Sequence, residues 1–103
     1  MSLDINDHIS SYQMELIKKI RIDNDLGLHA RAAAKIVALA GQYKASLFLR
    51  KNEHEVDGSS ILSILTLSCP KGTNIALRVV GEDSGVLMDA LSELVEKKFG
   101  EEK

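Results

Sequence analysis

The chain has 103 residues, which is enough for one compact domain and too few for two. Thirteen Lys and Arg against fifteen Asp and Glu give a formal net charge of -2, which disfavours non-specific binding to a nucleic-acid backbone. Cys69 is the only cysteine, so an internal disulfide and an all-cysteine metal site are excluded, and a cytoplasmic location is expected.

Residues 1–14 are polar without a sustained period, which predicts a flexible N-terminal extension ahead of one domain at residues 15–103. No apolar run approaches the roughly 20 residues of a membrane span, so we expect no membrane insertion. The predicted elements are, in chain order, a strand at 15–23, a helix at 30–40, strands at 45–51 and 54–56, a short helix at 61–67, a strand at 75–79 and a helix that begins after Asp83 or Ser84.

This order, β-α-β-β-α-β-α, predicts an α+β fold. We expect an open-faced β-sandwich in which three helices cover one face of a four-stranded antiparallel sheet. The first strand alternates around Lys18, Ile20 and Ile22, which predicts one buried face. Basic side chains predominate in residues 15–51 and acidic ones in 52–103, which indicates either two solvated faces or a positive face for an acidic partner.

A candidate site lies where a loop enters the first predicted helix, in the run Gly27-Leu-His-Ala-Arg31. The first turn of a helix presents unpaired N–H groups and a partial positive charge, so the amides of Ala30, Arg31 and Ala32 are expected to bind phosphate. The same field disfavours a protonated imidazole, which leaves His29 as a neutral nucleophile. Alternatively, His29 is only an N-cap residue and Arg31 only a solvated charge.

The segment 26–35, Leu-Gly-Leu-His-Ala-Arg-Ala-Ala-Ala-Lys, resembles the active-site signature of the HPr family, the histidine-containing phosphocarriers of the bacterial sugar phosphotransferase system. The segment 56–63, Val-Asp-Gly-Ser-Ser-Ile-Leu-Ser, is similar to the second signature of that family. Residues 70–73 and 81–83 also match its spacing, so the resemblance extends over residues 15–100.

The resemblance implies that His29 is phosphorylated by enzyme I, which draws the group from phosphoenolpyruvate, and passes it to an enzyme IIA. Arg31 matches the arginine that steadies the phosphoryl group. It further implies a monomeric carrier without independent turnover and without a cofactor.

Ser60 aligns with a serine that, in many members, is phosphorylated by HPr kinase/phosphorylase as a regulatory switch; alternatively it is a plain helix N-cap. The resemblance also implies an apolar docking patch for partners, for which the alternative is burial of its apolar members. The predicted docking residues are Leu28, Lys35, Ile61, Leu62 and Leu65.

One position departs from the family pattern, because Ala32 stands where a proline normally follows the arginine. Alanine is an excellent helix former, so the helix is expected to persist, but the junction loses a rigid element. We therefore expect phosphorylation with an altered rate or phosphohistidine lifetime.

Other functions also fit parts of the sequence. The same site fits a paralogue in a regulatory phosphorelay that transports no sugar, or a small phosphatase acting on acyl phosphates through Arg31. An RNA-binding module is disfavoured because the chain has only four aromatic residues. His8, His29 and His54 are too scattered for a metal motif, so no metal is expected.

Overall fold

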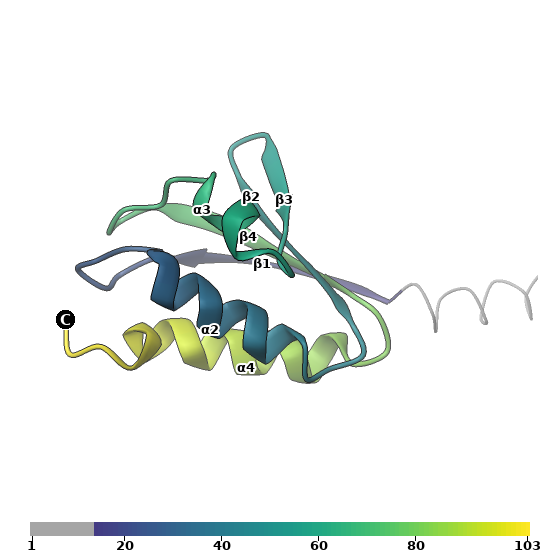
Figure 1. The fold of residues 1–103 in the computed structure, drawn as a ribbon. Helices are drawn as coiled ribbons and strands as arrows, with labels where there is room; N and C mark the ends of the chain where they lie inside the picture. The colour runs from purple at the N-terminus through teal and green to yellow at the C-terminus, as the bar shows by residue number, and fades with distance from the viewer. Residues whose placement is uncertain (1–13) are drawn as a thin grey trace, which may run out of the picture.

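The computed structural model describes residues 14–103, so the predicted extension lies, apart from Met14, outside the described residues. Four strands, three α-helices and a 3-10 turn follow one another along the chain (Figure 1). They are β1 (Glu15–Arg21), α2 (Ala30–Ala40), β2 (Ser46–Lys51), β3 (His54–Asp57), α3 (Ile61–Leu65), β4 (Asn74–Val80), α4 (Ser84–Glu96) and η1 (Lys98–Gly100).

The strands form one antiparallel sheet in the order β1-β4-β2-β3, as the predicted fold requires. β4 is central: its Leu77 lies opposite Lys18 of β1 and Leu49 of β2. Because β1 and β2 both pair with β4, the connection that contains α2 crosses over the central strand. This crossover places α2 against the face of the sheet rather than at its edge.

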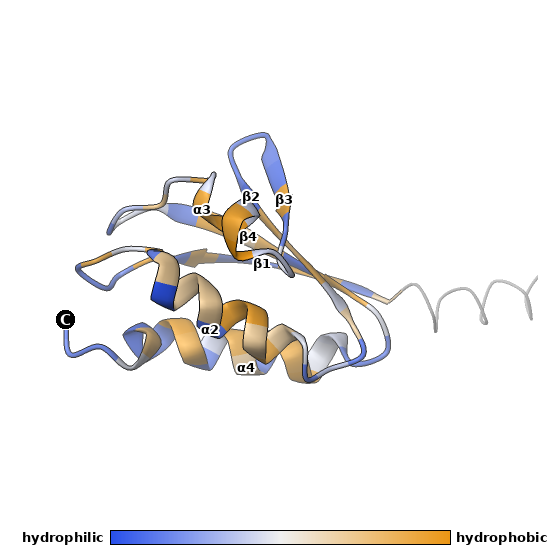
Figure 2. Ribbon diagram, in the orientation of Figure 1, coloured by the Kyte–Doolittle hydropathy of each residue, from blue (hydrophilic) through white to orange (hydrophobic). Residues whose placement is uncertain are grey.

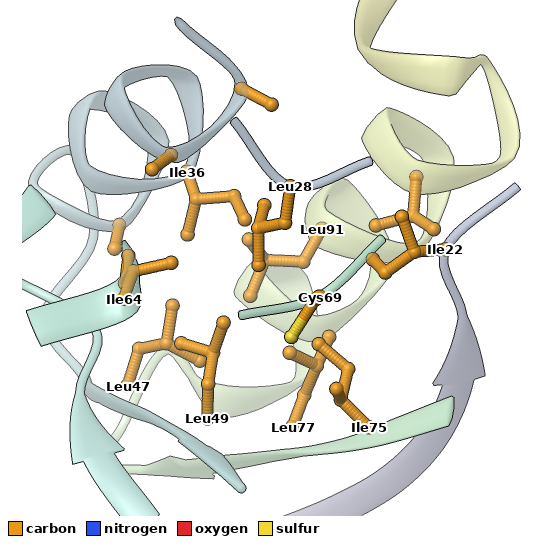
Figure 3. Packing of buried hydrophobic residues seen from close by; sticks show 14 of the residues in the cluster. Ile22, Leu28, Ile36, Leu47, Leu49, Ile64, Cys69, Ile75, Leu77 and Leu91 are labelled. Atoms are coloured by element: carbon orange, nitrogen blue, oxygen red, sulfur yellow. The ribbon is translucent and has the colours of Figure 1, made fainter. Parts of the chain in front are cut away.

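Helices α2 and α4 lie side by side beneath one face of the sheet, and α3 contacts α2 (Figure 1). Alternate residues of β2 and β4 point toward these helices and are buried. Figure 2 shows that apolar residues recur along both α2 and α4. Figure 3 shows the resulting single core, in which the labelled residues include Ile36, Leu47, Leu49, Ile64, Leu77 and Leu91.

The predicted element boundaries agree with the structure to within two residues, and α2 agrees at both ends. The predicted face of the first strand does turn toward the helices, but within the strand itself it is less buried than predicted. Within β1 only Ile20 is even partly buried, because this strand lies at the sheet edge and α4 covers only part of it. Lys18 does point toward the helices, where its Nζ donates to Ser92 Oγ at 2.7 Å, and Ile22 is buried just beyond the strand.

The chain continues past the end of α4, and its last residues lie near the loop before α2, where Asp25 N donates to Lys103 O (Figure 1). Lys98, Phe99 and Gly100 have φ values of 53°, 57° and 82°, in the left-handed region that side chains with a Cβ rarely adopt. The Phe99 side chain is 1% exposed, and its burial in the core offsets this local strain. The segment that follows α4 is therefore a packed part of the domain.

No helix within residues 14–103 is long and apolar enough to cross a membrane.

Shortening Leu77 tests the position of the core. Leu77→Ala should lower the free energy of unfolding by about 2–5 kcal/mol, because it leaves a cavity beneath the central strand. Val86→Ala on the exposed side of α4 is the matched control, and its effect should stay within about 0.5 kcal/mol. Urea unfolding followed by circular dichroism measures both, and equal losses would contradict this description of the core.

Candidate functional site

His29 is the N-cap residue of α2 and has an extended backbone, with φ -83° and ψ 179°. Its side chain makes no capping hydrogen bond, while its carbonyl oxygen accepts from Ala33 N at 2.8 Å. Within the described chain, the amides of Ala30, Arg31 and Ala32 donate to no backbone or side-chain acceptor. The predicted free amides therefore open beside the imidazole, where an anion would meet their partial positive charge.

The loop before α2 is fixed by close contact with a second backbone segment. Gly27 has a φ of 68°, and a Cβ built on it would lie 2.6 Å from Cys69 O, so no larger residue fits without displacement. Leu28 N donates to that same carbonyl at 2.8 Å. The Leu28 side chain is only 5% exposed and belongs to the core, so its burial fixes the backbone position of the adjacent His29. Its predicted place on an exposed docking patch is therefore wrong.

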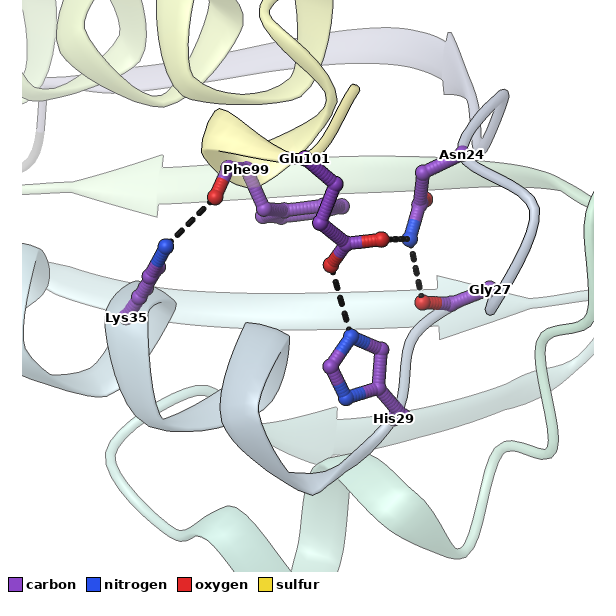
Figure 4. Close-up of polar contacts among 6 residues, drawn as sticks. All are labelled: Asn24, Gly27, His29, Lys35, Phe99 and Glu101. Atoms are coloured by element: carbon purple, nitrogen blue, oxygen red, sulfur yellow. Dashed lines mark hydrogen bonds and ion pairs between the residues drawn. The ribbon is translucent and has the colours of Figure 1, made fainter. Parts of the chain in front are cut away.

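The imidazole of His29 contacts the C-terminal segment of the chain (Figure 4). Its Nε2 lies 2.7 Å from Glu101 Oε2, and the second carboxylate oxygen accepts from Asn24 Nδ2 at 2.9 Å. Asn24 is fully buried, and its Nδ2 also donates to Gly27 O at 2.8 Å. The hydrogen bonds from His29 and Asn24 hold the pKa of the Glu101 carboxyl below its usual range.

The ionised Glu101 carboxylate can only accept a hydrogen bond, so Nε2 must carry a proton. In the neutral ring the lone pair then resides on Nδ1, which is the nitrogen left free for chemistry. The ring is three-quarters covered, with 24% of its side chain exposed, and the Glu101 side chain is 14% exposed. The site thus presents one open nitrogen beside a row of free amides.

The two predicted basic residues of α2 occupy different positions. Arg31 is exposed and makes no ion pair or side-chain hydrogen bond within the described chain, and its charge adds to the lowering of the Glu101 pKa. Its guanidinium is thus available to an incoming anion near the ring. Lys35 instead donates through Nζ to Phe99 O at 2.5 Å, so it ties α2 to the C-terminal segment.

Ser60 caps α3, as its alternative interpretation predicts. Its Oγ accepts from Ser63 N at 3.2 Å, whereas the Ser59 hydroxyl donates to Asp57 Oδ1 at 2.8 Å. The cap does not conflict with modification, because Ser60 is a partly exposed residue at the start of the helix.

The apolar residues of α3 divide between surface and core. Leu62 is 77% exposed and Ile61 is also exposed, while Leu65 is partly buried against the core. The alternative that all three are buried is therefore wrong. Since α3 contacts α2, this exposed pair lies on the same helical layer as His29.

Sequence reasoning missed Glu101 and Asn24, although both contact the predicted site. Glu101 lies 72 positions from His29 along the chain, and no local pattern connects the two. Asn24 carries only the signal of a turn-forming residue. The one available signal is Gly100, because a glycine between a helix end and an acidic residue is typical of a chain reversal.

Residues outside this site offer little other chemistry. Within residues 14–103, no group of three or more His, Cys, Asp or Glu side chains is arranged to hold a metal ion. Burial raises the pKa of the Cys69 thiol, so it stays protonated and packs as an apolar side chain.

Comparisons with known proteins agree with this geometry. A family model described as "PTS HPr component phosphorylation site" matches residues 16–97. The chain is 45% identical over 84 residues to the phosphocarrier protein HPr of Pseudomonas aeruginosa, which covers 81% of this chain and 93% of that protein. It is 37% identical over 87 residues to the phosphocarrier protein NPr of Shewanella violacea, covering 84% and 96%.

A solved structure shows the same fold. The crystal structure of HPr-C-His from Thermoanaerobacter tengcongensis has a TM-score of 0.82 and 35% identity, covering 85% of this chain and 99% of that one. The fold and site thus define a phosphocarrier protein of the phosphotransferase system. The chain belongs to the HPr family.

Acid should loosen the C-terminal segment. The Glu101 pKa is lowered below 4.5 in the folded chain, so its stabilising effect is fully present above about pH 4.5 and is lost as pH falls through the lowered value. Asp25, whose pKa is lowered by Lys71, should act in the same direction below 3.8. Amide hydrogen exchange should show the donors of this segment, Asp25 N (to Lys103 O), Gly100 N and Glu101 N, losing protection before the core strands. Simultaneous loss everywhere would contradict this expectation.

Proposed function

We propose that His29 accepts a phosphoryl group from phospho-enzyme I and passes it to an enzyme IIA. The observation that carries the proposal is the open Nδ1 of His29 beside the three free amides of α2, within the residues that match a family phosphorylation site. Arg31 supplies a charged fork to the phosphoryl oxygens. The protein turns nothing over alone, because each transfer needs a partner on either side.

In the phosphoryl transfer, the bond that forms at His29 is matched by the bond that breaks at the donor. The Nδ1 lone pair attacks phosphorus, the Nδ1–P bond forms, and the bond from phosphorus to the donor breaks with its electron pair returning to the donor. The amides of Ala30, Arg31 and Ala32 then face the phosphoryl oxygens, whose negative charge the helix N-terminus favours. The reverse sequence of bond changes delivers the group to the acceptor.

Two settings fit this chemistry. Sugar transport is the setting that the resemblance to the HPr family implies, and a regulatory phosphorelay served by a paralogue is the second candidate. The chain is similar to phosphocarriers named HPr and to one named NPr. Side-by-side phosphorylation by purified enzyme I homologues of the source organism distinguishes the two settings, because each relay has its own donor. In either setting we expect a cytoplasmic monomer that uses no cofactor.

Replacing His29 tests the carrier function. Incubation with phosphoenolpyruvate, magnesium and enzyme I should give a 31P NMR signal of an acid-labile phosphohistidine in the wild type and none in His29→Ala. His54→Ala is the matched control, since His54 is exposed on β3 and should leave the signal unchanged. The function would be refuted if the wild type stayed unmodified while the same enzyme I phosphorylated another carrier.

We further propose that the exposed pair Ile61 and Leu62 docks partner proteins. Leu62→Glu should lower the second-order rate constant of transfer from enzyme I about tenfold or more, because a charge enters an apolar contact. The fold should persist, since Leu62 points into solvent. Val86→Glu, also on an exposed apolar position, is the control, and equal slowing by both variants would sink the docking assignment.

Ser60 lies next to this pair, which supports its role as a regulatory site. A phosphate on Ser60 would add about two negative charges beside the docking residues while remaining compatible with the start of α3. We expect HPr kinase/phosphorylase to modify the wild type and Ser59→Ala but not Ser60→Ala, as measured by intact mass. Modification of Ser60→Ala would place the acceptor elsewhere.

A further inference from the structure

We propose that Glu101 is a positioning residue of the phosphoryl-transfer site, which keeps the proton of His29 on Nε2 and balances the positive charge of the ring when Nδ1 carries a phosphoryl group. The charge-balancing role of Glu101 rests on the proposed function. The placement of the proton on Nε2 concerns the unmodified protein and can be tested without any partner.

The carboxylate is fixed at both oxygens. Oε2 faces His29 Nε2 at 2.7 Å, and Oε1 accepts from Asn24 Nδ2 at 2.9 Å (Figure 4). Asn24 is itself oriented, because the same Nδ2 donates to Gly27 O in the loop that leads to His29. The carboxylate therefore contacts the loop before α2 both through Asn24 and through the His29 ring. These two contacts restrict its rotation.

The segment that carries Glu101 is also held in place. Phe99 is buried in the core, Lys35 Nζ donates to Phe99 O, and Asp25 N donates to Lys103 O at 2.9 Å. These contacts join the C-terminal segment to α2 and to the loop before α2. Glu101 lies outside residues 16–97, so the family match does not account for this arrangement.

The carboxylate has a distinct role at each stage of transfer. Before transfer, it accepts from Nε2–H and leaves the Nδ1 lone pair free. When the Nδ1–P bond forms, the ring gains a positive charge, and the proton on Nε2 stays where it is. The neighbouring negative charge of Glu101 stabilises that cation, as the orienting carboxylate does beside the histidine of a catalytic triad. No proton has to enter or leave in either direction.

Replacing Glu101 with glutamine tests whether the carboxylate positions the proton of His29 or only fills space beside the ring. An amide keeps the shape of the carboxylate but has one acceptor and one donor end. Asn24 Nδ2 requires the acceptor end, so the amide NH₂ would face His29 Nε2 and demand a lone pair there. The proton would then move to Nδ1 and block the nucleophile. Glu101→Ala imposes no such demand, so it should disturb the chemistry less than the isosteric change does.

The experiment compares Glu101→Gln and Glu101→Ala with the wild type, and uses Glu102→Gln on the neighbouring exposed carboxylate as control. Side-chain 15N spectra of 15N-histidine-labelled proteins at about pH 8.5, where histidine side chains are neutral, report which ring nitrogen carries the proton. Rates of phosphorylation by phospho-enzyme I are measured on the same samples, and amide spectra establish that each variant is folded.

We expect Nε2–H in the wild type and in Glu102→Gln, and a shift toward Nδ1–H in Glu101→Gln. The phosphorylation rate should fall at least about tenfold in Glu101→Gln and less in Glu101→Ala. An unchanged 15N pattern in Glu101→Gln, or a larger rate loss in Glu101→Ala than in Glu101→Gln, would overturn the proposal. If the wild type takes no phosphoryl group, the proposed function fails while the 15N pattern still decides the role of Glu101.

Discussion

Burial of one face of the sheet is the constraint on which the rest of the structure depends. β2 and β4 each present alternate apolar side chains to that face, and two long helices must cover them. Small residues of α2, Ala32 and Ala33, are fully buried and let this helix pack closely beside its neighbours. α2 begins at Ala30 with this buried face, and His29 is its N-cap residue.

The site combines a local feature with a long-range one. The free amides and the open Nδ1 of His29 belong to one loop and the first turn of one helix. The long-range feature is the contact of the ring with Glu101 at 2.7 Å, which follows the buried Phe99 and the left-handed segment after α4. Strain at Lys98 and Phe99 is thus found next to the functional site, where such conformations are commonly concentrated.

The opposite face of the sheet is occupied by its own polar contacts. Arg78 lies 4.2 Å from the centre of the Phe48 ring and pairs with Glu55 at 2.8 Å and Glu15 at 3.0 Å. These interactions join four strands across the uncovered face. The docking pair proposed above lies instead on the helical side, where Leu62 is exposed and α3 contacts α2.

Local patterns in the chain predict the elements, the fold class and the position of His29 at a helix start, because periodicity, capping residues and glycines act over a few neighbouring positions. They also indicate Ser60 as a cap. Long-range packing places Leu28 in the core, leaves β1 largely exposed and brings Glu101 to the imidazole. Each of these depends on which segments pack together, and residues separated by most of the chain carry no local pattern that records their contact.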